Sequence, residues 1–225
     1  MEKKIKILAL VNSGGSKYHR VIIPLDLLDK EKYEVVFLNE NFILESVVKD
    51  IDYLYIHWFQ KTNCVYLSLW REKYGFKIIQ DIDDYWVLPH NHYMSSRIEE
   101  AKKQLINQLI LADTVLCSTQ YLLEKCRKFN DNCHLRENYI PIGYHQFQPE
   151  LIKVENRKPS IGICGSLSHY DDWMSIRNQL KRIQSLDKYF DFVVAGYADE
   201  NKRSKDRWDK IIRLFKNPKV YRHLP

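Results

Sequence analysis

The sequence has no long apolar run and no pair of cysteines at C-x-x-C spacing. No stretch approaches the roughly 20 apolar residues that a membrane-spanning helix needs. The opening segment MEKKIKILALV is too short and too strand-like for a signal peptide. The five cysteines are odd in number, and three of them stand in apolar runs: Cys64, Cys117 and Cys164. We therefore expect reduced core thiols in a cytoplasmic protein.

The chain also lacks the features of common nucleic-acid-binding modules. It has no recognition-helix pattern, no RNP-like aromatic strand and no block of Lys and Arg. The net charge of +6 permits attraction to phosphates without requiring it. With 225 residues, 45% of them hydrophobic, the chain can bury the core of one large domain or two small ones. We expect no nucleic-acid partner.

Short apolar runs alternate with amphipathic segments along the first part of the chain. The pattern predicts strands at residues 4–11, 33–38, 52–56, 76–79 and 114–118. It predicts helices at residues 42–49, 67–73 and 95–111. Strands that alternate with helices in this way favour a mostly parallel sheet with right-handed crossovers.

The pattern restarts after a polar and charged stretch. Further strands are predicted at residues 160–164, 190–195 and 219–222. We therefore place a first domain at residues 1–150, a linker at 151–158 and the beginning of a second domain at 159–225. Three strands at most are fewer than such a second domain normally contains, so we expect it to be only partly present.

Acidic residues follow the buried strand in the segment FKIIQDIDDYW. Asp81, Asp83 and Asp84 stand close together there, and His57 stands at the end of the preceding strand. Ligands bind at the carboxyl ends of the strands in open α/β sheets. A solvated turn with helix-capping Asp residues is the alternative, and an isolated acidic turn would favour it.

A glycine turn follows the first predicted strand. Gly14 and Gly15 precede a helical pattern, and Arg20 stands near its start. Strand, glycine turn and helix together can aim backbone N–H groups at an anion, although the turn is neither G-x-G-x-x-G nor a P-loop. A plain strand–helix connection remains open. The second domain begins similarly, with Gly165 and Ser166 in a turn and a capping box predicted at Ser168-x-x-Asp171.

Five segments, in order, resemble the GT-B glycosyltransferases of the large retaining family (family 4, or group 1): KIKILALVNSGGSKYHRVIIPLDLL, GFKIIQDIDDYW, ADTVLCSTQYLLEK, ENYIPIGYHQF and SIGICGSLSHYDDW. The resemblance implies two Rossmann-like domains of the GT-B type, the first complete and the second only partly present. It implies transfer of a sugar from a nucleotide-sugar donor to a saccharide, lipid or other hydroxyl acceptor. The nucleotide sugar is a co-substrate, and neither a cofactor nor a metal is implied.

The resemblance also assigns the candidate residues. The second domain of such enzymes binds most of the donor, and the first binds the acceptor. Carried over, Gly14, Gly15, Gly165, Ser166 and His169 line the cleft, and the glycine turn after the first strand faces the donor phosphates. Arg20, near the start of the following helix, is a further candidate for the donor phosphates because of its position there. We assign Asp83 and His57 as the catalytic pair, with Asp83 contacting the acceptor or orienting His57.

The family's paired-glutamate motif, late in the second domain, has no counterpart here. We therefore expect a fragment that binds the donor weakly and turns over little or nothing. The expected location is the cytoplasm, with a peripheral contact to the inner face of the membrane through a glycan or lipid-linked acceptor.

Two alternatives compete with this interpretation. Asp81 and Asp83 also resemble the D-x-D of metal-dependent GT-A enzymes, whose carboxylates hold Mn²⁺ or Mg²⁺ against the diphosphate. Loss of activity in EDTA would favour that class. The other alternative is a non-enzymatic basic α/β binding module, which a salt-dependent gel shift would support.

Overall fold

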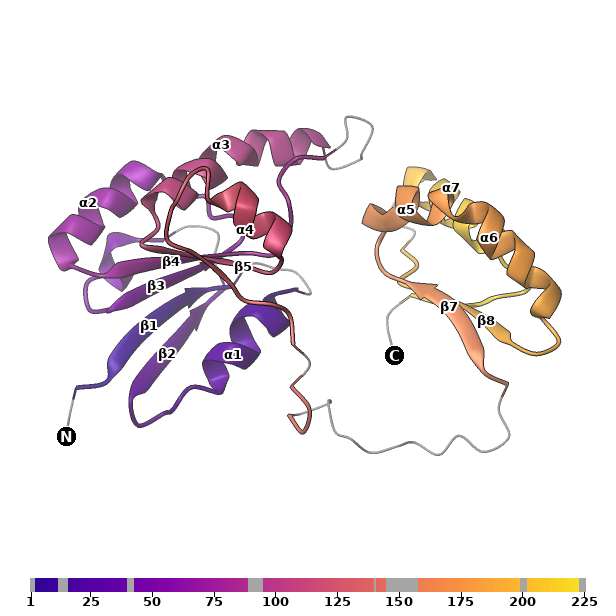
Figure 1. The fold of residues 1–225 in the computed structure, drawn as a ribbon, viewed down its shortest axis with the longest axis horizontal. Helices are drawn as coiled ribbons and strands as arrows, with labels where there is room; N and C mark the ends of the chain where they lie inside the picture. The colour runs from indigo at the N-terminus through magenta and orange to yellow at the C-terminus, as the bar shows by residue number, and fades with distance from the viewer. Residues whose placement is uncertain are drawn as a thin grey trace. The chain divides into compact units, whose positions relative to one another are not determined.

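The computed structural model describes residues 3–11, 16–39, 43–88, 95–139, 141–144, 158–198 and 202–222. They form two compact units, each with its own parallel sheet (Figure 1). The first unit includes the described residues up to Tyr144, and the second those from Lys158 onward. Residues 151–157 of the predicted linker lie outside the described residues.

The first unit contains a six-stranded sheet in the order β2-β1-β3-β4-β5-β6, with every pair parallel. Its strands are β1 (Ile5–Leu10), β2 (Tyr33–Leu38), β3 (Tyr53–His57), β4 (Lys77–Ile82), β5 (Thr114–Cys117) and β6 (Cys133–Leu135). Its helices are η1 (Tyr18–Ile22), α1 (Ile23–Asp26), η2 (Glu45–Val47), α2 (Cys64–Tyr74), α3 (Ser95–Leu111) and α4 (Gln120–Cys126).

Helices cover both faces of this sheet (Figure 1). Leu67 of α2, Leu109 of α3 and Leu122 of α4 pack with the larger hydrophobic cluster on one face. Val21 and Leu25, in η1 and α1, pack against the other face. Burial on both faces explains why the central strands are apolar along most of their length. No helix in the described parts of the chain combines the length and apolar character that crossing a membrane requires.

Local signals in the sequence set several helix ends. The Asn63 side chain accepts a hydrogen bond from the Val65 N–H at 2.8 Å and caps α2, which ends at Gly75 with φ +79°. Thr119 Oγ1 accepts the Leu122 N–H at 3.2 Å and caps α4. Pro24 lies in the first turn of α1, which continues directly from η1. Proline has no N–H to donate to the carbonyl four residues earlier, and that Arg20 carbonyl accepts hydrogen bonds from the Tyr55 and Arg136 side chains instead.

The second unit contains a three-stranded parallel sheet in the order β7-β8-β9. Its strands are β7 (Ser160–Cys164), β8 (Asp191–Ala195) and β9 (Lys219–Tyr221). Its helices are η3 (Leu167–His169), α5 (Tyr170–Ser175), α6 (Arg177–Arg182), η4 (Ile183–Leu186) and α7 (Lys202–Ile212). Trp208 and Ile211 of α7, both fully buried, pack with Phe192 and Val194 of β8 in a separate core.

Three local expectations were wrong, and one strand was missed. Within residues 43–49, the helix expected at 42–49 is only the short 3-10 turn η2. The short strand β6 was not predicted. Ser166 caps η3, while α5 begins after His169 with no side-chain cap, so the predicted capping box at Ser168-x-x-Asp171 does not form. Cys164 is exposed rather than in the core, because β7 is an edge strand in the described sheet.

Candidate active site

The candidate site lies at the carboxyl edge of the first sheet, where the strand order reverses. After β1 the chain adds β2 on one side of it, and from β3 onward it adds strands on the other side. The order therefore reverses between β1 and β3. Ligands bind at such a switch point in open parallel sheets. His57 is the last residue of β3, and Asp83 directly follows β4. The topology therefore places the predicted pair at the preferred binding edge.

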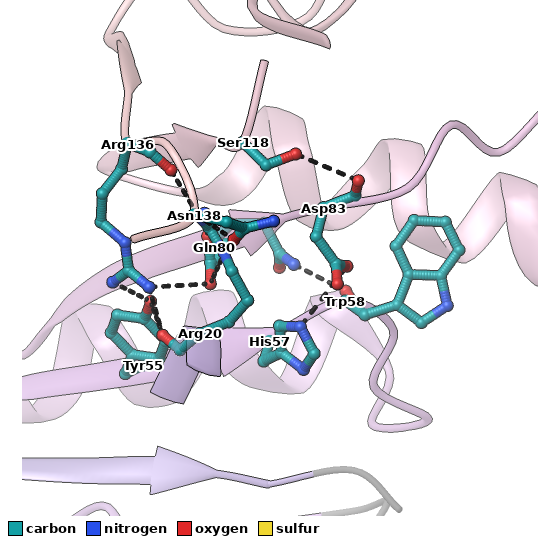
Figure 2. A network of polar contacts seen from close by, with 10 residues as sticks. Arg20, Tyr55, His57, Trp58, Gln80, Asp83, Ser118, Arg136 and Asn138 are labelled. Carbon is teal, nitrogen blue, oxygen red and sulfur yellow. Dashed lines mark hydrogen bonds and ion pairs between the residues drawn. The ribbon is translucent and has the colours of Figure 1, made fainter. Parts of the chain in front are cut away.

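His57 and Asp83 face each other in Figure 2, with His57 Nε2 3.4 Å from Asp83 Oδ1. This separation is long for a hydrogen bond. The side chains are only 4% and 10% exposed. Burial alone raises the pKa of Asp83, but His57, the Ser16 hydroxyl and the Arg20 charge outweigh it and bring the pKa below its ordinary value. Asp83 is therefore an ionised carboxylate at neutral pH.

Hydrogen bonds fix the backbone on both sides of this pair (Figure 2). Ser118, directly after β5, donates its hydroxyl to the Asp83 carbonyl at 3.1 Å. The N–H of Trp58 donates to the Asp81 carbonyl at 2.8 Å. The Gln80 side-chain amide donates to the Trp58 carbonyl at 2.6 Å. These bonds hold the ends of β3, β4 and β5 in one arrangement, which limits how far the two side chains can move apart.

A buried ion pair between Arg20 and Asp81 lies beside the site. The two side chains are 1% and 0% exposed. Arg20 Nε donates to Asp81 Oδ2 at 3.1 Å, and Nη2 donates to Oδ1, which makes the contact bidentate. The remaining nitrogen, Nη1, donates to the Arg136 carbonyl and to Asn138 Oδ1. Arg20 thus connects β4 to the segment that follows β6.

Arg136 completes the same network from the other side. Its Nη2 lies 3.6 Å from Asp81 Oδ2, and its Nη1 donates to the Tyr55 hydroxyl at 2.8 Å. Burial, with the Asp81 charge beside it, raises the pKa of Tyr55 well above its ordinary value. The hydroxyl therefore stays protonated, and it donates to the Arg20 carbonyl at 3.2 Å.

These contacts change the interpretation of two predicted residues. Arg20 was expected to bind a phosphate, yet each of its three guanidinium nitrogens has a protein partner. Asp81, the first carboxylate of the metal-dependent alternative, is fully buried against Arg20 and Arg136. Among the residues that the structure describes, no three His, Cys, Asp or Glu side chains gather as a metal site.

The predicted residues of the second unit lie at the carboxyl end of β7. Gly165 has φ +149°, and a Cβ added there would lie 3.2 Å from both His169 Cδ2 and Trp173 Cζ2. The positive φ and these two close contacts therefore favour a glycine here, whatever binds nearby. Ser166 Oγ accepts the Ser168 N–H at 3.3 Å, and the half-exposed His169 lies 3.1 Å from Asp172 through Nδ1 and Oδ2. Gly14 and Gly15 lie outside the described residues.

Sequence reasoning missed four residues that shape the site: Tyr55, Gln80, Ser118 and Arg136. Tyr55 and Gln80 sit within strands and look like ordinary strand residues. Ser118 and Arg136 each directly follow a strand, which is the same signal that identified Asp83. Applying that rule to the end of the strand predicted at residues 114–118 would have drawn attention to Ser118. Arg136 could not have been found in this way, because β6 was not predicted.

No protein-family model matches the chain, and no curated protein matches it. Solved structures do match. The S. aureus protein MnaA, in a co-structure with UDP, aligns over 98% of this chain and 69% of its own at 12% identity and a TM-score of 0.61. The UDP-GlcNAc 2-epimerase from Neisseria meningitidis bound to UDP-GlcNAc aligns over 98% and 73% at 11% identity and a TM-score of 0.56.

The glycotransferase of kitacinnamycin aligns over 100% of this chain and 72% of its own at 10% identity and a TM-score of 0.51. At such identities the likeness shows the fold alone. The chain is therefore an α/β protein with Rossmann-like units of the GT-B type, and its first unit has the six-stranded parallel sheet of that fold.

Proposed function

We propose that the chain acts on a nucleotide sugar and transfers the sugar to a hydroxyl group of a saccharide or lipid-linked acceptor. One observation carries the proposal: the buried His57–Asp83 pair at the carboxyl ends of β3 and β4, next to the switch point of a GT-B-type sheet. An ionised carboxylate is the acceptor best suited to sugar hydroxyls. Membership of the large retaining family is the finer part of the same proposal.

The fold neighbours support a nucleotide sugar as the donor. One is a co-structure with UDP, one is bound to UDP-GlcNAc, and one is a glycotransferase. These ligands belong to the neighbours. We extend the ligand class to this chain because it shares their fold and because its candidate residues lie at the carboxyl edge of a parallel sheet, where ligands bind. The runner-up class, a metal-dependent GT-A enzyme, has less support because Asp81 is committed to two arginines.

In the proposed reaction, the bond between the anomeric carbon and the diphosphate breaks as the acceptor oxygen bonds to that carbon. The acceptor's proton ends on the departing diphosphate. Asp83 accepts a hydrogen bond from the acceptor hydroxyl, and His57 keeps the carboxylate in position. The protein contributes to this reaction by positioning the reactants in a site with little water and by stabilising the charge that develops. We retain Gly165, Ser166 and His169 as the donor-side residues of this proposal.

The test is a transfer assay with UDP-glucose, UDP-galactose and UDP-N-acetylglucosamine as donors. Methyl glycosides and a lipid-linked saccharide serve as acceptors. We expect UDP release, followed by phosphorus NMR, together with an acceptor whose mass has increased by one sugar. EDTA should leave the rate unchanged. The proposal fails if the chain binds none of the three donors and releases no UDP.

Epimerisation is the second candidate, because the N. meningitidis neighbour is a UDP-GlcNAc 2-epimerase. An epimerase inverts C2 of the sugar and needs no acceptor. Proton NMR of UDP-N-acetylglucosamine incubated with the chain alone separates the two activities. A second UDP-sugar that accumulates without acceptor indicates epimerisation, and product that forms only with acceptor indicates transfer.

A further inference from the structure

Trp58 has an unusual backbone conformation for a large aromatic residue. Its φ is +59°, in the left-handed region that favours Gly and tolerates Asn. A Cβ in this conformation approaches the following carbonyl oxygen, so a bulky side chain adopts it only where the surroundings enforce it. Trp58 directly follows His57, at the carboxyl end of β3. An observed outlier at this edge calls for a functional explanation.

The enforcing contacts come from β4. The Trp58 N–H donates to the Asp81 carbonyl at 2.8 Å, and its carbonyl accepts from the Gln80 side chain at 2.6 Å. Gln80 is fully buried, and its Oε1 has no hydrogen-bond partner within the described part of the chain. An apolar residue at position 80 would avoid the cost of that buried acceptor. The reason for a buried amide at position 80 is therefore the hydrogen bond that its N–H donates, which holds the backbone of Trp58 in place.

These contacts hold the Trp58 indole next to the His57–Asp83 pair. Figure 2 shows the ring extending from the backbone beside the Asp83 carboxylate. Trp58 is partly buried against the main core and partly exposed. One aromatic surface therefore stands beside an ionised carboxylate, which is the combination of apolar wall and few polar groups that binding sites use.

We propose that the Trp58 indole is the stacking platform for the pyranose ring of the saccharide acceptor. This inference rests on the proposed function and adds the acceptor-recognition residue to it. A pyranose has an apolar face of C–H groups and a rim of hydroxyls. The face packs on the indole while a rim hydroxyl reaches Asp83, so the two contacts together set the orientation of the attacking hydroxyl. Gln80 acts as the positioning residue for this platform.

Three variants at one position test the proposal. Trp58→Phe keeps an aromatic face, Trp58→Leu keeps bulk without one, and Trp58→Gly removes the side chain while relieving the positive φ. The probes are methyl glucopyranoside, methyl galactopyranoside and methyl mannopyranoside, with UDP as a separate probe for the donor. Saturation-transfer NMR reports which sugar protons lie against the protein, and titration gives the dissociation constants.

We expect the wild type to saturate the C–H protons of at least one glycoside. Trp58→Phe should keep most of the affinity, while Trp58→Leu and Trp58→Gly should weaken it about tenfold. UDP affinity should not change in any variant. Trp58→Gly should melt at or above the temperature of Trp58→Leu, because glycine releases the backbone strain. A melting transition above the titration temperature in each variant shows that affinity is not lost through unfolding.

Two outcomes overturn the inference: glycoside affinity equal in wild type and folded Trp58→Leu, or no glycoside bound by the wild type. If UDP still binds in either case, only the stacking role fails. If UDP and the three UDP-sugars do not bind, the proposed function fails. The glycoside titrations then still show whether a pyranose ring stacks on Trp58.

Discussion

Arg20 and Asp81 form the most buried charge contact of the described residues, and its stability depends on both partners being present. Removing a charge from water is costly, and only a bidentate contact with further hydrogen bonds repays it. Arg20 meets this condition through Asp81, the Arg136 carbonyl and Asn138. The two residues lie 61 positions apart in the sequence, so no local pattern predicts the pair.

We predict that Asp81→Asn lowers the free energy of unfolding by about 3–5 kcal/mol, because it leaves the Arg20 charge buried without a counterion. Arg20→Met should cost less, since Arg136 Nη2 lies 3.6 Å from Asp81 and partly replaces the missing charge. Urea unfolding of both single variants and the double variant gives the coupling energy, which we expect to be about 0.5–3 kcal/mol. Strictly additive losses would show that the two side chains do not stabilise each other.

The lowered pKa of Asp83 predicts a pH dependence of stability. A carboxyl group whose folded pKa is depressed adds stability above its unfolded pKa, about 3.9. It loses that contribution as the pH falls through the folded value. The difference in unfolding free energy between wild type and Asp83→Asn should therefore shrink as the pH falls below about pH 4. A difference that does not vary with pH would contradict the assigned shift.

At the scale of the elements, two glycines with positive φ predict different costs. A Cβ at Gly75, the residue after α2, would meet nothing within 4 Å, so only backbone strain opposes Ala there. A Cβ at Gly196, after β8, would lie 2.0 Å from the Gly165 carbonyl oxygen, which is part of the backbone. Gly75→Ala should cost about 1–2 kcal/mol, and Gly196→Ala should add an overpacking cost of about 1–3 kcal/mol.

Melting curves of the two variants check this difference, with Gly75→Ala serving as the matched control for strain alone. Equal losses in both variants would mean that the backbone near Gly196 can yield to a methyl group. Gly165 and Gly196 each follow one of two adjacent parallel strands, β7 and β8. Their close contact therefore lies at the same edge of the sheet as the proposed donor-side residues.

Most elements could be predicted because their signals are local. The strand that ends at Cys117, the helix Ser95–Leu111 and the Thr119 cap each depend on residues within one segment. β6 was missed because three residues are too few to show a period. Local signals also do not reveal whether a thiol is buried. Cys164 has apolar sequence neighbours, but it is exposed because β7 lies at the edge of the described sheet.

The same distinction separates the site residues. His57 and Asp83 could be found because each stands at the end of a strand, where the topology brings ligands. Their separation of 3.4 Å depends on the register between β3 and β4, which the sequence does not encode locally. The arginine network and the left-handed Trp58 likewise arise from contacts between distant segments.

At the scale of the whole molecule, each unit has its own parallel sheet and its own core. The proposed chemistry is divided in the same way, with acceptor recognition in the first unit and donor recognition in the second. This division predicts that changes at the first sheet edge alter turnover and leave donor binding intact. Asp83 and its exposed neighbour Asp84 offer a matched pair for that comparison.

The most direct measurement is the turnover number and the UDP dissociation constant of Asp83→Asn and Asp84→Asn beside the wild type. The account predicts that Asp83→Asn lowers turnover at least tenfold, a loss of about 1.4 kcal/mol or more of transition-state stabilisation. UDP affinity should stay unchanged, and Asp84→Asn should behave as wild type. If Asp83 only caps the following segment, Asn replaces it well, and full turnover in Asp83→Asn would contradict the central claim.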